Sequence, residues 1–473
     1  MPSRSAPDGV TLLAVACYAA SAAVCCVVAS TGHAPFGDLR IYRSGGAAVL
    51  HGAPLYDLRF AWNLGFTYPP FAALVFTLLA ATPWPVVPPL VTAISVGLFP
   101  VTLWLALRLP RGSRGPCGTQ GPCGTRGPCG TRGPYGTRGL CGRRGPCGTR
   151  RSVRMAPNDR SPADDSASAP RLDGRRAARL ALAGAAVAVW LEPVRTDLAY
   201  GQINLVITAL ILYDLSREDR ARLKGAAIGL AAGLKLTPVI FVVYLAMTRR
   251  YRAAAVSAAT FAVTVAAGFA ADPSDSTQFW ARTFASPERI GRIENAANQS
   301  LRGALARVLH TTTIQPWWLM AAVTVGLAGL SLAAAAGRRG DEAAGFSLCA
   351  VTALLVSPVS WSHHWVLAVP ALLVLAVSAW RSRSAWLITA ATALAVTGWS
   401  RIVWQVPIGQ GQHAELHLDP LQLGYSDAYV AAGLAVLAVT GSRLARQSRG
   451  MRERSRDRGD PDAVVVAAAR GAK

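Results

Sequence analysis

Residues 37–70 read GDLRIYRSGGAAVLHGAPLYDLRFAWNLGFTYPP and form the first long polar interruption of a largely apolar chain. An apolar run at 10–30 precedes this stretch, and a second apolar run begins at its Pro69-Pro70 pair. The first run is long enough to cross a bilayer. We therefore expect residues 31–68, which are rich in charged and aromatic side chains, to form a functional loop at a membrane surface.

The composition predicts an all-α, polytopic membrane protein. Of 473 residues, 52% are hydrophobic, the mean hydropathy is +0.31, and the charges lie in short runs between apolar stretches of roughly membrane-spanning length. No small-residue cleavage site follows the first apolar run, so we predict a first transmembrane helix and no cleaved signal peptide.

The net charge of +23 is interpreted as a topology signal and not as a nucleic-acid-binding surface. Residues 111–179 carry fifteen Arg against four Asp, and shorter basic segments occur at 249–252, 338–339, 381–383 and 443–473. By the positive-inside rule all of them should be cytoplasmic.

This assignment determines the expected number of spans. The apolar stretch 69–108 contains four prolines between 83 and 89, so we expect a short re-entrant or interfacial helix at 69–82 and a transmembrane helix at 86–108. Two short helices are expected to meet near Lys235-Pro238, because one helix would place the basic segments at its ends on opposite sides. We therefore expect twelve transmembrane helices, with both termini cytoplasmic. The first two are 10–30 and 86–108, and the remaining ten are 178–191, 202–215, 219–234, 235–248, 253–271, 316–337, 344–357, 365–380, 386–404 and 427–442.

Four regions follow from this pattern. Residues 1–108 hold the first helices and the loop 31–68, and residues 178–442 hold the remaining bundle. Residues 109–177 are expected to be a disordered basic insert, and 443–473 a disordered basic tail.

Within the insert, residues 115–150 repeat GPCGTR-like hexapeptides with Gly at every third position. A collagen-like triple helix is the weaker alternative. The five Cys of the repeat lack the C-x₂-C spacing of a zinc site.

The predicted topology brings distant polar groups to the same, outer side of the membrane. These include the loop of Asp38, the turn at 192–204, Lys235, the loop 272–315 and His363-His364.

The same segments carry a family resemblance. The motifs are GDLRIYRSGGAAVLHGAPLYD with FTYPP, GQINLVITALILYDL, GLAAGLKLTPVIFVVYLAMTRRYRAA, NQSLRGAL and SPVSWSHHWVLAVPAL. In order and spacing they resemble the actinobacterial polyprenol-phosphate-mannose-dependent alpha-(1→2)-mannosyltransferases of glycosyltransferase family 87, which have the GT-C fold. The resemblance covers nearly the whole chain except 109–177 and the tail. It implies that mannose is moved from a polyprenyl-phosphate donor to a glycolipid or lipoglycan acceptor outside the cell membrane. No cofactor or metal beyond the lipid-linked donor is implied.

By motif position, the resemblance makes Asp38 the catalytic residue of the first outer loop. A sugar hydroxyl becomes a good nucleophile only as a base removes its proton, so one carboxylate suffices for an inverting displacement. A retaining hydrolase would need two close carboxylates. The structural alternative is that Asp38 caps a helix at 39–50.

Other polar residues are candidates for substrate binding. Lys235 lies in an apolar stretch, where an ammonium group is costly unless it is paired or reaches the interface. It could bind the donor phosphate, as could Arg302, or it could simply snorkel. Asn204, with Gln202, is most simply a helix cap, and Tyr68 a rigid entry to the re-entrant helix. The substrate-binding residues that we predict are Arg40, Tyr42, Tyr68, Asn204, Lys235 and Arg302.

His363 and His364 are assigned to catalysis. Either could hydrogen-bond the acceptor hydroxyl or the departing phosphate, or relay the proton from Asp38. His413 and His417 lack the H-E-x-x-H order, so no metal site is expected there.

Two alternatives stay open. The runner-up donor is polyprenyl-phosphate-arabinose, since nothing in the residues distinguishes the two sugars. A transporter or lipid flippase could have similar helices, but it would be expected to show matching internal halves, which this chain lacks.

Overall fold

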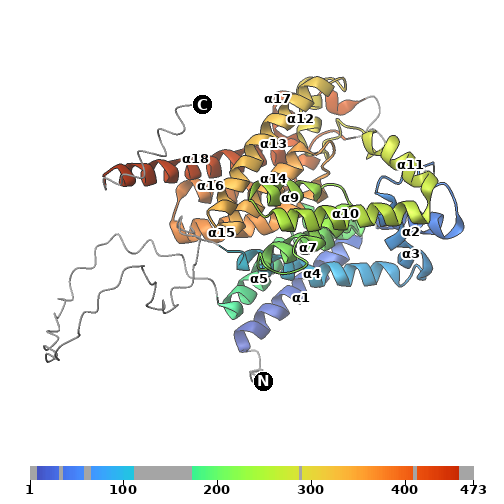
Figure 1. Ribbon diagram of the computed structural model, residues 1–473, viewed down its shortest axis with the longest axis horizontal. Coiled ribbons are helices and arrows are strands. Elements are labelled where there is room, and N and C mark those ends of the chain that lie inside the picture. Colours follow the sequence, from blue (N-terminus) through green and yellow to red (C-terminus); the bar gives the residue numbers. More distant parts are fainter. Residues whose placement is uncertain are drawn as a thin grey trace, which may run out of the picture.

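The computed structural model describes residues 8–30, 36–57, 65–110, 173–286, 290–408 and 413–457, and these ranges are almost entirely helical. Figure 1 shows α2 (Gly37–His51), α3 (Pro70–Ala81) and α11 (Pro273–Ala281) together at the right-hand end of the molecule. The last turns of α18 (Ala428–Asp457) lie at the left. The polytopic all-α class predicted from the sequence is confirmed.

Seven helical segments in the described ranges are long and apolar enough to cross a membrane. They comprise α1 (Gly9–Ser30), α4 (Val87–Arg108), α10 (Tyr251–Ala271), α13 (Gln315–Arg338), η5 (Ser362–Ala368) with α15 (Val369–Ser382), α16 (Ala385–Ser400) and α18. An eighth span results if α5 (Gly174–Ala188) and α6 (Glu192–Tyr200), which are bent by 80°, count as one.

The expected twelve full-length spans are therefore not supported within these ranges. Apolar helices that we counted as spans have only 9 to 15 residues in the structure, short of the roughly 20 needed to cross a bilayer. They are α7 (Asn204–Ser216), α8 (Ala226–Leu234), α9 (Val239–Met247) and α14 (Glu342–Val356). Hydropathy does not distinguish a helix that faces lipid from one enclosed by other helices, and nearly every residue of α14 is buried.

Helices α8 and α9 form a hairpin whose tip carries Lys235. The residues before α8 and after α9 meet, because Arg252 donates hydrogen bonds of 2.9 and 2.7 Å to the carbonyl oxygens of Asp219 and Ala221. The two short helices predicted from the basic segments are thus confirmed, with both basic ends at the same end of the bundle.

Close packing against α10 holds the hairpin in place. A Cβ atom added at Gly229 would lie 2.3 Å from the carbonyl oxygen of Ser257, and one at Gly233 would lie 2.4 Å from Oγ1 of Thr264. Small residues at four-residue spacing allow two membrane helices to approach this closely.

The basic segments of the described ranges lie at one end of the bundle, as predicted. Arg179, at the start of α5, pairs with Asp8 at the start of α1, so the chain's first helix and the residues after the insert begin at one end. One cavity at that end is lined by Arg108, Arg249, Arg338 and Arg381. The insert's hexapeptides, 115–150, lie outside the described residues.

The structure differs from the prediction in two terminal or loop regions. Residues 443–457 were expected to be disordered, but α18 continues to Asp457. Six of these fifteen residues are Arg, and Leu, Ala, Gln, Met and Glu occur once each, all good helix formers. The segment 272–315 contains two helices that hydropathy did not predict, α11 and α12 (Leu301–Val308), because both are short and neither is strongly apolar.

Candidate active site

A cavity of about 1060 Å³ lies at the end of the bundle that is opposite the basic segments. Its walls come from the start of α2, residues 65–69, the α6–α7 and α8–α9 junctions, residues 290–297, the end of α14 and η5. Five polar side chains from separate parts of the chain face it, namely Asp38, Gln202, Lys235, His363 and His364. The convergence predicted from the topology is therefore present.

Asp38 does not cap its helix. Phe36 occupies the N-cap position of α2 without a side-chain hydrogen bond, and Asp38 lies within the first turn. Its carboxylate accepts a hydrogen bond from Nε2 of Gln202. The hydroxyl of Tyr42 donates to Oε1 of Gln202 over 2.5 Å and lies 2.9 Å from the hydroxyl of Tyr68.

Gln202 also determines the proton position on His363. An ionised carboxylate only accepts hydrogen bonds, so the NH₂ group of Gln202 must face Asp38. The same nitrogen lies 3.1 Å from Nε2 of His363. That ring nitrogen must then accept, which places the proton of a neutral His363 on Nδ1.

Two cations line the cavity, Lys235 and Arg292, and Arg292 is paired with Glu294. The Nζ atom of Lys235 donates a hydrogen bond of 2.9 Å to Oδ1 of Asn204 and lies 3.0 Å from Nε2 of His364. Because an ammonium group only donates, Nε2 of His364 must accept. Asn204 in turn donates 2.8 Å to the buried carboxylate of Asp197. Lys235 is thus held directly by partners from α7 and η5, and Asp197 of α6 holds one of these partners.

The environment of Asp38 changes its acidity. Desolvation raises the pKa of the Asp38 carboxyl to about 6, and the hydrogen bond from Gln202 and the charge of Lys235 oppose this rise. The carboxylate is still ionised at neutral pH, and its pKa lies close to the range suited to a general base.

A second buried carboxylate fixes the segment that carries the histidines. Glu192 is 1% exposed and accepts hydrogen bonds of 2.7 Å from Ser362, 3.0 Å from Trp404 and 2.7 Å from Tyr429. Ser362 directly precedes His363, so this contact anchors the start of η5.

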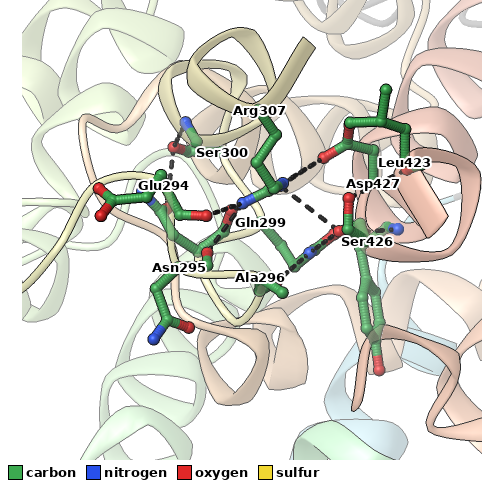
Figure 2. A network of polar contacts seen from close by, with 12 residues as sticks. Glu294, Asn295, Ala296, Gln299, Ser300, Arg307, Leu423, Ser426 and Asp427 are labelled. Carbon is green, nitrogen blue, oxygen red and sulfur yellow. Dashed lines mark hydrogen bonds and ion pairs between the residues drawn. The ribbon is translucent and has the colours of Figure 1, made fainter. Parts of the chain in front are cut away.

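Residues 290–300 are tied to the same segment. Asn298 Oδ1 accepts a hydrogen bond of 3.0 Å from the backbone of Ser360, and the Gln299 carbonyl accepts 3.1 Å from Trp365 Nε1. Figure 2 shows the fully buried Arg307 beside this loop. Its guanidinium donates to Asp427 and to the carbonyl oxygens of Glu294, Asn295, Asn298 and Ser426. The NQSLRGAL motif, residues 298–305, therefore supports residues 290–297, which line one wall of the cavity, without lining the cavity itself.

The predicted site residues fall into three groups. Asp38, Tyr68, Lys235, His363 and His364 line the cavity. Directly behind them lie Tyr42 and Asn204, which contact Gln202 and Lys235. Arg40 and Arg302 are not part of the lining.

These two arginines contact aromatic rings elsewhere. The guanidinium of Arg40 lies 4.5 Å from the ring centre of Trp84, and that of Arg302 lies 5.4 Å from the ring centre of Trp318. Because the structure places both away from the cavity wall, we leave them out of the proposed mechanism.

Two important residues were not assigned to the site from sequence. We expected Gln202 to be a helix cap, but Ile203 holds the N-cap position of α7, without a side-chain hydrogen bond. Glu192 was noted only as part of an outer turn. The GQINL motif was the available signal for Gln202. Within the described ranges, no three His, Cys, Asp or Glu side chains form a group able to hold a metal ion.

Comparisons with known proteins place the sequence in a family. The model of glycosyltransferase family 87 matches residues 150–358. The chain is 32% identical over 449 residues to the polyprenol-phosphate-mannose-dependent alpha-(1-2)-phosphatidylinositol mannoside mannosyltransferase of Mycolicibacterium smegmatis, covering 92% of this chain and 89% of that protein. The chain belongs to glycosyltransferase family 87.

Further relatives of this family 87 chain carry similar names. The Mycobacterium tuberculosis protein of the same name is 30% identical over 90% of this chain and 89% of its own length. A Mycolicibacterium smegmatis phosphatidylinositol pentamannoside mannosyltransferase is 30% identical over 71% of this chain and 68% of its own length. No solved structure gives a significant match. This family 87 protein is thus a membrane glycosyltransferase, as the motifs predicted.

Proposed function

We propose that this glycosyltransferase moves mannose from polyprenyl-phosphate-mannose to a hydroxyl group of a phosphatidylinositol mannoside or a related glycolipid. The names of the relatives support both substrates. The observation that carries the proposal is the pairing of a carboxylate, Asp38, with a cation, Lys235, in one large cavity. The reaction needs a base for the hydroxyl and positive charge for the leaving phosphate.

In the proposed reaction, Asp38 is the general base. The acceptor hydroxyl oxygen attacks the anomeric carbon, its proton passes to the Asp38 carboxylate, and the bond from the anomeric carbon to the phosphate oxygen breaks. Polyprenyl phosphate leaves with the bonding electron pair. A single displacement of this kind inverts the anomeric configuration and requires no further cofactor.

Lys235 is proposed to bind the donor phosphate. The polyprenyl-phosphate donor carries negative charge that increases as the sugar departs, so an ammonium group stabilises the transition state more than the ground state. Hydrogen bonds that Lys235 donates to Asn204 and His364 already orient it before the donor binds. Such preorganisation avoids a reorganisation cost during the reaction.

The histidines are proposed to act next to the reacting groups. Nε2 of His363 is engaged by Gln202 and Nε2 of His364 by Lys235, so neither nitrogen is available as the first base. The Nδ1–H groups of the two rings remain as donors for a sugar hydroxyl or for the departing phosphate.

The cavity is proposed to face outward from the cell membrane. The basic segments lie at the opposite end of the bundle, and the positive-inside rule assigns that end to the cytoplasm. Single cysteines at position 57, on the cavity end, and at position 220, on the basic end, would test this orientation after replacement of native Cys. Labelling of position 220 in intact cells by an impermeant reagent would reverse it.

The transfer reaction itself is tested with membranes that contain the full chain. Labelled polyprenyl-phosphate-mannose and polyprenyl-phosphate-arabinose are supplied separately with a phosphatidylinositol mannoside acceptor. We expect labelled glycolipid only from the mannose donor, and none from membranes carrying Asp38→Asn. Product from the arabinose donor alone would favour the arabinofuranosyltransferase alternative.

A further inference from the structure

A second cavity, of about 860 Å³, lies at the end of the bundle opposite the candidate active site. Helices α9 and α14 connect the two cavities directly, because each has one end in either wall. With nine and fifteen residues at 1.5 Å per residue, these helices separate the cavities by about 14 to 22 Å. The second cavity is therefore separate from the catalytic one.

The wall of this second cavity is strongly basic. Seven basic residues and three acidic residues line it. Two of the acidic side chains are already neutralised, since Asp219 lies 3.1 Å from Lys224 and Glu342 is paired with Arg250. A clear excess of positive charge remains around an open volume.

Helix capping explains only part of this charge. Arg338 donates 2.8 Å to the carbonyl oxygen of Met247 at the end of α9, which is a favourable position for a cation at a helix C-terminus. Arg108 lies over the ring of Trp104, 4.5 Å from its centre.

Unlike Arg338 and Arg108, Arg249 and Arg381 have no contact within the described ranges that would explain their position in the wall of the second cavity. Both side chains are exposed, and neither guanidinium makes a hydrogen bond or ion pair within the part of the chain that the structure describes. Arg249 is also held at a φ of 62°, an uncommon conformation for a residue with a side chain. Two guanidinium groups thus line a basic cavity without an internal partner.

We propose that the second cavity is a binding site for a phosphate-bearing anion, with Arg249 and Arg381 as its main ligands. Guanidinium groups suit phosphate because their N–H donors match the spacing of its oxygens. Basic pockets between membrane helices are typical sites for anionic lipid headgroups. The anion is either such a headgroup or a soluble phosphate, and the binding test separates these sources. The proposal does not rest on the proposed transfer reaction.

Binding is measured on the purified full chain in detergent, through the rise in unfolding temperature that a ligand of the folded state produces. Three probes are titrated separately, which are dioleoyl phosphatidylglycerol, dioleoyl phosphatidylcholine and inorganic phosphate. We expect a rise with phosphatidylglycerol and none with phosphatidylcholine. An equal rise with inorganic phosphate would identify a soluble phosphate as the ligand, whereas a rise with the lipid alone would identify a headgroup.

The variant Arg249→Gln/Arg381→Gln should weaken this binding at least about tenfold, as expected for the loss of charge-assisted hydrogen bonds. The double variant Arg220→Gln/Arg222→Gln is the matched control, because it removes the same charge from exposed residues at the same end that do not line the cavity. It should bind like the parent. The two single variants replace the double if that protein is not monodisperse.

The proposal is wrong if phosphatidylglycerol and inorganic phosphate both leave the unfolding temperature unchanged. Equal weakening in the cavity variant and the control would also overturn it, since general surface charge would then explain the binding. Because the readout is binding and not transfer, an inactive but lipid-binding protein would separate this proposal from the proposed function.

Discussion

The side-chain nitrogen of Gln202 lies 3.1 Å from Nε2 of His363 and donates a hydrogen bond to the carboxylate of Asp38. One amide thus links the proposed base on α2 with a histidine that is more than 300 residues away in the sequence. The carbonyl side of the amide is held by the hydroxyl of Tyr42, so the group cannot rotate without losing contacts on both sides. This relationship leads to the first two predictions below.

Asp38→Asn should abolish most of the transfer activity without unfolding the protein. The substitution keeps the size of the side chain but removes the base, and such a loss typically costs about 10²- to 10⁴-fold in rate. Transfer and donor binding are measured on the same membranes. Asp57→Asn is the control, because Asp57 lies outside the cavity, where it accepts a hydrogen bond from Gln278. The Asp57→Asn protein should remain active. Near-normal transfer by Asp38→Asn would make Asp38 structural and direct the search for the base to His363 or His364.

The transfer rate should fall as the pH is lowered through about 6. The base acts only when ionised, and desolvation raises the pKa of Asp38 to about 6, so protonation below this value removes activity. Gln202→Ala removes a hydrogen bond that lowers the pKa, and the acidic limb of the profile of kcat/KM against pH should therefore move to higher pH. Gln278→Ala, which changes a half-buried glutamine outside the cavity, should leave the limb in place. An unshifted limb in Gln202→Ala would argue against this coupling.

Lys235→Met should lower kcat/KM for the lipid-phosphate donor by about 10- to 100-fold, the range expected for a lost charged hydrogen bond. The effect should appear largely in kcat if Lys235 stabilises the developing phosphate charge. Asn204→Ala keeps the charge but removes one of its partners, so a smaller loss is expected. Unchanged kinetics in Lys235→Met would assign the lysine to packing at the hairpin tip.

Arg307→Gln should destabilise the part of the molecule around residues 290–307 and Asp427. The guanidinium is fully buried, pairs with Asp427 and donates to four backbone carbonyl groups, so its removal leaves the Asp427 carboxylate without its ion-pair partner and each carbonyl oxygen with one hydrogen bond fewer. Breaking a buried pair in this way typically costs about 3–5 kcal/mol. Thermal unfolding in detergent measures the loss. Asp427→Asn retains a hydrogen-bond acceptor and should show a smaller decrease in Tm than Arg307→Gln. Small decreases of equal size in both variants would contradict this account.

Gly229→Ala should destabilise the α8–α10 contact, since the new methyl group would lie 2.3 Å from the Ser257 carbonyl oxygen. Overpacking of this kind costs about 1–3 kcal/mol. Gly97→Ala on α4 is the matched control, because nothing lies within 4 Å of a Cβ at that position. We expect a lower Tm for the first variant only. Similar Tm values for both would mean that the hairpin adjusts without cost.

The sequence by itself determined the class of the protein, which segments gather at the same end of the bundle, and the motifs of its family. Hydropathy and the distribution of Arg are local properties, and they correctly placed the basic segments at one end and Asp38 with His363 at the other. They also predicted the break at Lys235-Pro238, because a single helix would have separated two basic ends.

Only the tertiary structure decided which helices are long enough to cross a membrane and which polar groups touch. Helix α14 is as apolar as a span, yet it has 15 residues and is enclosed by its neighbours, a difference that composition does not record. Gln202 resembles a helix cap in sequence, and its contacts with Asp38 and His363 arise from the packing of α2, the α6–α7 junction and η5. Arg40 and Arg302 show the converse, since both occur in family motifs but point to tryptophan rings instead of the cavity. The direction of a side chain depends on the arrangement of distant helices, and so it follows from long-range packing and not from the local pattern.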